Sequence, residues 1–297
     1  YMRYLWMASD FGEVEATARL AEIYQRGKMV DEDIEESKRL LVIATEGADW
    51  EQADRFEWSM NQKTKTLFIR GGSISDRDNG MPWEDYKSSI KSVFIFEGVN
   101  EVRDGVFRGL RELESVHIPS SVDLTTSNPF VDCHKLEKIE VSGSSKKYAT
   151  EDGVLFNKEK TLLISCPQTM SRLYKVPDGV KEIGDGAFSG CTELISVALP
   201  DSTTKIGMSA FENCPNLGSV AFPDKLEAIG NWAFCNCFRL QSISIGQIGF
   251  VGEGAFENTP HSSTQEGKSI DDLNQLIELA KKYSRGDGVP INRFRAI

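Results

Sequence analysis

The apolar residues of this chain recur along the sequence at a constant interval of about 23 residues, which lies in the range typical of repeat architectures. Three consecutive segments, starting at Ile183, Ile206 and Ile229, read IGDGAFSGCTELISVALPDS, IGMSAFENCPNLGSVAFPDK and IGNWAFCNCFRLQSISIGQI. Such repetition predicts a stacked architecture rather than a catalytic motif. Two sets of phenylalanines keep the interval: Phe107 and Phe130, and then Phe188, Phe211 and Phe234. Phe256 follows one position earlier than the interval requires.

A second apolar ladder lies beside the phenylalanines and has the form L-x-x-V-x-L. Val197 and Leu199, for example, are two residues apart and point to one side of a short strand. One such strand cannot bury its apolar side alone, whereas stacked coils can. Self-similarity at roughly 20–29 residues with this pattern predicts a leucine-rich repeat solenoid, a right-handed coil with a parallel β-sheet face. The in-phase ladders begin at Ile90, Leu113, Leu136, Leu194, Leu217 and Leu240.

One coil is longer than the others. The next in-phase position after Leu136 is Ser171, which exceeds the regular interval by about half a repeat. Turn signals at Asp152-Gly153 and Asn157-Lys158 separate apolar runs there, so we expect a β-hairpin insertion that protrudes from the coil. The glycine that precedes each phenylalanine at the start of a segment predicts a bend with positive φ; these are Gly184, Gly207 and Gly230.

The motifs of this central region resemble the BspA-type leucine-rich repeat family. They are the IGxxAFxxCxxLxxVxLP segment, the PWxxYxxxIKxVxI opening at Pro82–Ile95 and the YxxxDGVLFN hairpin at Tyr148–Asn157. The resemblance covers about residues 65–260. It implies a non-enzymatic surface or secreted module, often from bacteria of the gut and mouth or from protozoa, and some members are adhesins. It implies no particular ligand.

The two ends of the chain have a different pattern, with apolar residues at helical spacing. They are similar to Sel1-like repeats, α-helical hairpins of the tetratricopeptide type that usually bind partners. We therefore predict Sel1-like helical repeats over 1–60, the solenoid over 61–262 and a partial Sel1-like repeat over 263–297. Because the last unit stops halfway, we expect either a longer parent protein or helices that cap the solenoid. Tyr24, Gly27 and Val30 near the N-terminus recur with the same spacing near the C-terminus, as Tyr283, Gly286 and Val289.

The charge of the chain argues against nucleic acid as a partner. The 297 residues include 34 Lys and Arg and 45 Asp and Glu, a formal net charge of −11, and no basic stripe is present in the sequence. Phosphate backbones are bound by clustered Lys and Arg. No apolar run approaches the about 18–20 residues of a membrane span, so we expect no membrane insertion.

The residues that could carry chemistry do not form a catalytic or metal-binding pattern. Of the three histidines, His117 lies between two apolar residues of a ladder and should face outward as an isolated surface side chain. Each of four cysteines lies the same number of residues after a phenylalanine of the repeat. This constant position predicts a stack of buried reduced thiols. Cys235 and Cys237 are too close together for the usual zinc spacing. The ladder cysteines are Cys133, Cys191, Cys214 and Cys237. We predict no catalytic residue, no metal and no cofactor.

The remaining candidate is the outer side of the sheet, where the residues between the ladder positions look outward. The first three rungs are varied, with an aromatic residue and both charges, whereas the last three carry only Ser and Ala. Binding hot spots favour aromatic residues and Arg, so we expect a ligand to contact the first rungs. The predicted contacts are Ser92, Phe94, Ser115, His117, Lys138 and Glu140.

Together with the lack of a catalytic pattern, the family resemblance implies a repeat protein that is not an enzyme and that binds another protein or a host or cell-surface ligand. The family resemblance favours the cell surface or secretion. An alternative is a cytoplasmic scaffold in which the Sel1-like helices recruit the partners and the solenoid spaces them. A third hypothesis, a hydrolase that acts on surface polymers, would require a deep pocket with paired carboxylates or a metal.

Overall fold

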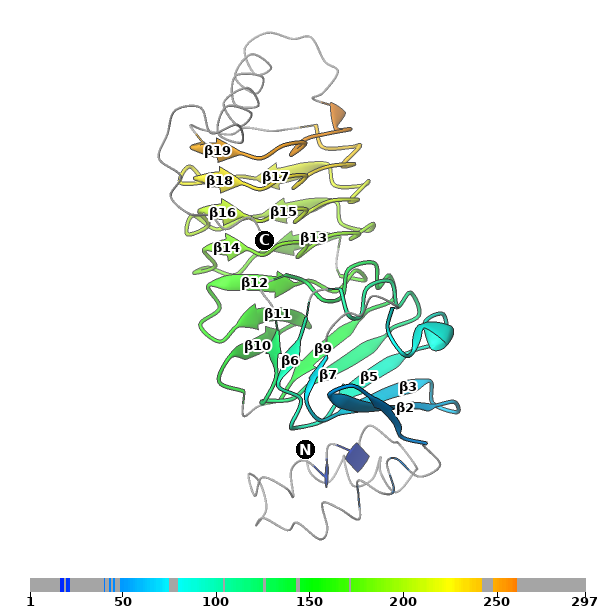
Figure 1. Ribbon diagram of the computed structural model, residues 1–297. Helices are drawn as coiled ribbons and strands as arrows, with labels where there is room; N and C mark the ends of the chain where they lie inside the picture. Colours follow the sequence, from blue (N-terminus) through cyan, green and yellow to red (C-terminus); the bar gives the residue numbers. More distant parts are fainter. Residues whose placement is uncertain are drawn as a thin grey trace.

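The chain folds into a solenoid of stacked coils, seen in a computed structural model (Figure 1). Each coil contributes a front strand, taken from the L-x-x-V-x-L ladder, and a shorter back strand that follows it. Front and back strands form separate sheets, and the coils divide into an N-terminal and a C-terminal stack. The structure describes residues 49–260, except 75–79, 104, 125–126, 143–144, 171 and 242–247, together with residues 17, 18, 20, 21, 40, 43 and 45.

The N-terminal stack has, among the described residues, a six-stranded front sheet and a three-stranded back sheet. The front sheet begins with antiparallel strands and continues with parallel ones, in the order β1-β2-β3-β5-β7-β9. The ladder residues Val93, Val116 and Ile139 are register partners, which confirms the predicted phase. The front strands are β1 (Glu51–Ala53), β2 (Phe56–Asn61), β3 (Thr66–Arg70), β5 (Ser92–Ile95), β7 (Ser115–Ile118) and β9 (Lys138–Val141); the back strands are β4 (Ser73–Ile74), β6 (Glu101–Val102) and β8 (Asp123–Leu124); a 3-10 helix, η1, spans Glu84–Tyr86.

Strand β1 and all but the last residue of β2 lie within the range 1–60 for which we predicted helical repeats. In β2 the buried Phe56 and Trp58 alternate with the partly exposed Glu57, the two-residue period of a strand with one buried side. This short alternation follows a longer stretch with helical spacing. The strand was therefore predicted as part of the helical repeats. The other predicted Sel1-like positions fall almost entirely outside the described residues, and 263–297 falls outside them completely.

The C-terminal stack has, in the described ranges, a three-stranded front sheet and a seven-stranded back sheet. Its front strands are parallel, and Tyr174, Val197 and Val220 are register partners that point into the core. The front strands are β13 (Leu173–Lys175), β15 (Ser196–Ala198) and β17 (Ser219–Ala221); the back sheet is β10 (Tyr148–Glu151), β11 (Val154–Asn157), β12 (Leu162–Ser165), β14 (Glu182–Ile183), β16 (Lys205–Ile206), β18 (Ala228–Ile229) and β19 (Phe250–Val251).

The insertion forms the predicted hairpin, but it does not protrude. Strands β10 and β11 pair antiparallel from Tyr148 with Asn157, around a turn at Asp152 and Gly153 that both have positive φ. Strand β11 then pairs with β12, and β12 continues in parallel into β14. Val154, Leu155 and Phe156 are all fully buried. The prediction of a protruding hairpin is therefore wrong. Strands β10–β12 instead form a layer inside the molecule, which we call the wall.

The wall separates two hydrophobic cores because its two sides face different stacks. On β11, Phe156 belongs to the core of the C-terminal stack, and the adjacent Leu155 belongs to that of the N-terminal stack. On β12, Leu163 and Ile164 divide in the same way. A strand buried on both sides reads as a continuous apolar run rather than an alternation. Figure 1 shows β10–β12 between the tilted N-terminal front strands and the regular C-terminal coils.

The hydroxyl of Tyr148 fastens the start of the wall to the N-terminal back sheet. It accepts a hydrogen bond from the backbone N–H of Leu124 at 2.8 Å and donates toward Asp123 Oδ1 at 3.0 Å. Burial raises the pKa of the Tyr148 phenol, so the hydroxyl keeps its proton. The side-chain hydrogen bond from Lys147, helped by Tyr148, lowers the pKa of Asp123.

We expect Tyr148→Phe to lower the free energy of unfolding by about 1–2 kcal/mol, because the buried N–H of Leu124 loses its acceptor. Urea unfolding followed by circular dichroism measures the loss. Tyr86→Phe, which removes a hydroxyl from a partly exposed residue of η1, is the matched control and should cost less than about 0.5 kcal/mol. Equal losses in the two variants would contradict the anchoring role.

The glycines before the phenylalanines are needed for a different reason from the one predicted. Gly184, Gly207 and Gly230 are not among the residues with positive φ, which occurs two positions later, for example at Gly186 and Ser209. A Cβ atom built on Gly207 would lie 2.7 Å from the backbone nitrogen of Asp185 in the preceding coil. These glycines therefore permit close approach between the backbones of successive coils.

Aromatic side chains fill the interior of both stacks. In the C-terminal stack, Phe188, Phe211, Phe234 and Phe256 lie ring on ring, with adjacent centroids 4.8, 5.0 and 5.3 Å apart. In the N-terminal stack, Trp83 starts a similar row, stacked on Phe107 at 5.9 Å. The predicted phenylalanine ladder is confirmed in both stacks, and the wall interrupts it between them.

Candidate binding face

The six predicted contact residues lie on the outer side of the N-terminal front sheet, in two rows across its strands. One row joins Ser92, Ser115 and Lys138 as register partners. The hydroxyl oxygens of Ser92 and Ser115 are 2.7 Å apart and hydrogen-bonded. The second row joins Phe94, His117 and Glu140. The strand phase thus places all six as expected, and their exposure decides which of them a ligand can reach.

Phe94 and His117 are buried, so the prediction that they are exposed to solvent is wrong. Their exposed fractions are 1% and 5%. The two rings are stacked on each other, with centroids 4.4 Å apart and planes 12° from parallel. The prediction took outward orientation as exposure, although another part of the chain covers the outer side of the sheet here.

The cover comes from the N-terminal end of the chain. Phe94 forms a cluster with Phe68 of β3, Phe96 and Ala18, and Trp50 packs against it. Ala18 is helical and fully buried. The Arg70 guanidinium lies 3.9 Å from the centre of the Trp50 ring, which adds a cation–π contact at the edge of the cluster. The cover removes adjacent outward aromatic side chains from water, which stabilises the folded chain.

We expect Ala18→Asp to release the cover, because the substitution places an unpaired carboxylate against the Phe68, Phe94 and Phe96 rings. Limited proteolysis should then cleave the chain on the N-terminal side of Trp50 at least tenfold faster than in the wild type. Ile43→Asp is the control, since Ile43 is also helical but 41% exposed. If both variants are cleaved at the wild-type rate, Ala18 does not hold the cover.

Four of the predicted residues remain accessible along the border of the covered area. Ser92 and Ser115 are partly exposed, and Lys138 is exposed. The Lys138 ammonium forms an ion pair with Glu140 on the same strand. The Lys138 side chain is 59% exposed and that of Glu140 is 21% exposed, so the ammonium is the more accessible charge of the pair.

The C-terminal front sheet presents an outer face that is not covered in this way. Leu173, at the start of β13, is 68% exposed, and Ile195, which precedes β15, is 41% exposed. The hydroxyl of Ser219 donates to that of Ser196 at 2.8 Å. We call this surface the open face; its outward residues are Leu173, Lys175, Ser196, Ala198, Ser219 and Ala221.

Two cations flank Leu173 on the open face. Arg172 is paired with Glu193 at 3.5 Å, and Lys175 with Asp178 at 3.8 Å. All four side chains are more than half exposed, and pairs at these distances exchange partners readily. The prediction missed Leu173 and Lys175 because their rung lacks the L-x-x-V letters. The signal was present at Val176 and Pro177, which repeat the phase of Leu199 and Pro200.

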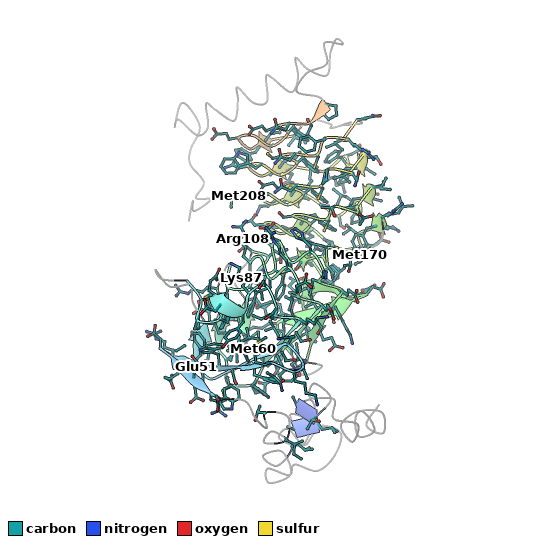
Figure 2. The ribbon with its side chains drawn as sticks, turned by 90° about the vertical axis from the view of Figure 1, so that its right-hand side faces the viewer. Glu51, Met60, Lys87, Arg108, Met170 and Met208 are labelled. Carbon is teal, nitrogen blue, oxygen red and sulfur yellow. The ribbon has the colours of Figure 1, made fainter. Side chains whose placement is uncertain are left out.

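A concave feature lies at the N-terminal end of the solenoid. It is a hollow of about 440 Å³, and Figure 2 labels two of its residues, Glu51 and Met60, in the lower half of the view. Carboxylates, amides and aromatic rings border it without a hydrogen-bonded catalytic arrangement among the described residues. The lining residues are Asp49, Glu51, Trp58, Met60, Asn61, Gln62, Lys63 and Tyr86.

The chemically reactive side chains have structural roles. All six cysteines are free and buried, as predicted, and burial raises the pKa of Cys133 and Cys237 to about 12. At neutral pH these thiols are protonated and inert. His134 Nδ1 is 2.8 Å from the Gln168 side-chain oxygen, and the Gln168 amide donates to the carbonyl of Ser189 at 2.7 Å.

Two further properties of the chain bear on other functions. Among the residues that the structure describes, no group of three or more His, Cys, Asp or Glu side chains is placed to hold a metal ion. Within the same ranges, no helix combines the length and the hydropathy that a membrane crossing requires.

Comparison with known proteins identifies the repeat. A family model of the BspA-type leucine-rich repeat region matches residues 85–175 and 165–277, in 6 copies. A comparison with curated proteins finds no match. Three solved structures are similar over most of their length. The pneumococcal vaccine antigen PcpA is 18% identical, with 71% of this chain and 80% of that chain covered and a TM-score of 0.41. A leucine-rich cell surface protein from Faecalibacterium prausnitzii is 19% identical, with 70% and 86% covered and a TM-score of 0.41. A leucine-rich repeat protein from T. pallidum is 21% identical, with 82% and 97% covered and a TM-score of 0.34.

Proposed function

This chain belongs to the BspA-type leucine-rich repeat family, and from that premise we propose that it is a non-enzymatic binding module at the cell surface or outside the cell. Its ligand is another protein or a cell-surface ligand. The support comes from the distribution of exposed side chains on the two front sheets. The phenylalanines of the N-terminal front sheet are covered by the chain itself, whereas the open face of the C-terminal stack is accessible.

The exposure of Leu173 is the observation that carries this proposal. A leucine that is 68% exposed, between two cations whose pairs are 3.5 and 3.8 Å long, offers one apolar anchor and two charges. The neighbouring rungs are flat because they carry only Ser and Ala, so a partner can approach the sheet without steric hindrance. An anchor surrounded by polar residues is the usual composition of a protein-binding surface.

The experiment measures how substitutions on the open face affect binding. The full chain is applied to an array of purified extracellular and cytosolic proteins, and the dissociation constant of each interaction is compared between variants. We expect Leu173→Ala to weaken the native interaction at least tenfold, about 1.4 kcal/mol. Phe238→Ala is the control, because Phe238 is 57% exposed but lies outside the front sheet. An interaction that loses affinity in the control and not in Leu173→Ala contradicts the proposal.

The accessible members of the predicted site form a secondary part of the proposal. We propose that Ser92, Ser115, Lys138 and Glu140 contact the edge of a ligand that extends onto the N-terminal front sheet. Contacts at such a rim are weaker than a central anchor. Replacing Lys138 and Glu140 together with Ala should therefore reduce affinity less than Leu173→Ala does, and the same array measures the difference.

An alternative is a cytoplasmic scaffold that recruits partners through Sel1-like helices. It is favoured by the recurrence of Tyr24 and Gly27 as Tyr283 and Gly286, positions that lie outside the described residues. This alternative expects cytosolic proteins on the array, bound with affinities that are unchanged in Leu173→Ala. Antibody labelling of intact against permeabilised cells of the source organism separates the two locations independently.

A further inference from the structure

Trp232 occupies a place in its coil where the backbone favours a small residue. Its φ is 53°, in the left-handed region that bulky side chains rarely adopt. The corresponding residues of the neighbouring coils also have positive φ and are small; they are Gly186, Ser209 and Gly254. A bulky residue held in such a conformation is typical of functional sites, because the strain has no benefit for folding.

The indole ring of Trp232 lies against the next coil. A Cβ atom built on Gly254 would lie 2.5 Å from Cδ1 and 2.6 Å from Nε1 of the indole, so the ring rests on the bare backbone of this glycine. Trp232 is nevertheless 39% exposed. The contact with Gly254 holds the ring in position, and its exposed part forms an aromatic platform.

A carboxylate lies beside the platform. Glu257 Oε2 is 3.1 Å from the same Cβ position on Gly254 that the indole approaches. Among the described residues, Glu257 forms no ion pair and the indole N–H forms no hydrogen bond. A hydrogen-bond acceptor and a donor are therefore available next to each other at the edge of the ring.

A ladder of asparagine side chains continues this polar surface. The Asn236 amide donates to Asn213 Oδ1 at 2.8 Å and accepts from the Asn258 amide at 2.9 Å. The backbone N–H of Asn236 donates to the carbonyl of Glu257 at 2.9 Å, so the ladder lies next to the Trp232 platform. All three side chains are at least partly exposed, and each NH₂ group keeps a second hydrogen for a ligand.

We propose that Trp232, Glu257 and the asparagine ladder bind a neutral oligosaccharide. The negative face of the indole attracts the C–H groups of a pyranose ring stacked on it. The carboxylate and the amides exchange hydrogen bonds with the sugar hydroxyls. Adjacent rungs of the ladder are about 4.8 Å apart, which is close to the length of one pyranose unit, so the rungs can follow consecutive sugars.

The charges near the platform favour a neutral sugar over a charged ligand. Glu257 and the net charge of −11 repel uronic acids and sulfated sugars. A cationic side chain of a basic peptide could lie over the indole next to Glu257, but it would make no use of the amide ladder. The site includes no residue of the open face, so its ligand is independent of the partner proposed there.

The experiment titrates the full chain with neutral hexasaccharides of glucose, xylose, mannose and N-acetylglucosamine, and with hexagalacturonate as the anionic comparison. Isothermal titration calorimetry measures the dissociation constants. We expect at least one neutral hexasaccharide to bind with a Kd below about 1 mM, and hexagalacturonate to bind at least tenfold more weakly. Trp232→Gly removes the ring, suits the positive φ and should weaken binding at least tenfold. Trp232→Phe should weaken it less, because an aromatic ring remains.

Further variants make the result specific to this site. Asn258→Ala should weaken binding about threefold, because one rung of the ladder is lost. Met208→Ala is the matched control, since Met208 is 44% exposed in the preceding coil and should not affect the affinity. Leu173→Ala should also leave it unchanged, which separates this site from the open face. Circular dichroism confirms that each variant is folded.

Three results would overturn the proposal. The first is that no neutral hexasaccharide binds, and the second is that Trp232→Gly binds the sugar as tightly as the wild type does. The third is that a hexalysine peptide binds with an affinity that depends on Trp232 while the neutral sugars do not bind.

Discussion

Replacing Gly230 with Ala is expected to lower the free energy of unfolding of the C-terminal stack by about 3–5 kcal/mol. A Cβ atom at this position would lie 2.5 Å from the backbone nitrogen of Met208 and 2.6 Å from the carbonyl carbon of Gly207. Both atoms belong to the backbone of the preceding coil, so no side-chain movement can relieve the overlap. The N–H of Gly230 also donates to the carbonyl of Ile206 at 2.8 Å, and separating the coils would lengthen this bond.

The control for this prediction is Gly218→Ala. The nearest atoms to a Cβ atom there are the carbonyl oxygens of Arg239 and Ile195, at 3.6 and 3.8 Å, which is ordinary contact. The substitution should change the free energy of unfolding by less than about 1 kcal/mol. Urea unfolding of both variants is followed by circular dichroism, with hydrogen exchange to assign the loss to the C-terminal stack. A Gly230→Ala protein as stable as Gly218→Ala would show that the coils are not packed this closely.

Phe211→Ala should destabilise the C-terminal stack by about 3–5 kcal/mol. The Phe211 ring is fully buried between Phe188 and Phe234, with centroid distances of 4.8 and 5.0 Å and nearly parallel planes. Its removal leaves a cavity that the two neighbouring rings cannot fill, because the backbone spacing of the coils holds each ring in place.

The control for Phe211 is a phenylalanine of the same stack that is exposed. Phe238→Ala should cost less than about 0.5 kcal/mol, since its side chain is already 57% exposed. The two variants differ only in the position of the same chemical change. Calorimetric unfolding measures both, and a similar loss in the two proteins would contradict the role of the stacked ring.

The periodicity of the sequence was sufficient to predict the interior of the coils. The constant interval assigns Phe211 and Cys214 to the core without knowledge of the fold, because equivalent positions in a solenoid have equivalent surroundings. The hairpin at Asp152 and Gly153 could also be predicted, since its turn requires residues that accept positive φ. These features are local or strictly repeated.

The features that interrupt the repeat were harder to predict. The run Val154, Leu155 and Phe156 indicates a strand buried on both sides, but periodicity cannot identify what lies on the second side. The cover over Phe94 depends on Phe68, whose rung belongs to a β2–β3 hairpin that lacks the repeat pattern. The exposure of a candidate site was therefore decided by segments distant in the sequence, and only the structure brings them together.

The wall also has a consequence for how the length of the protein can change over time. A repeat array grows or shrinks by duplication and loss of single units, and each event disturbs the neighbours of the altered unit. Here a non-repeated element with one side for each core shields either stack from events in the other. Whole coils can be gained or lost in the C-terminal stack while the covered N-terminal sheet keeps its composition.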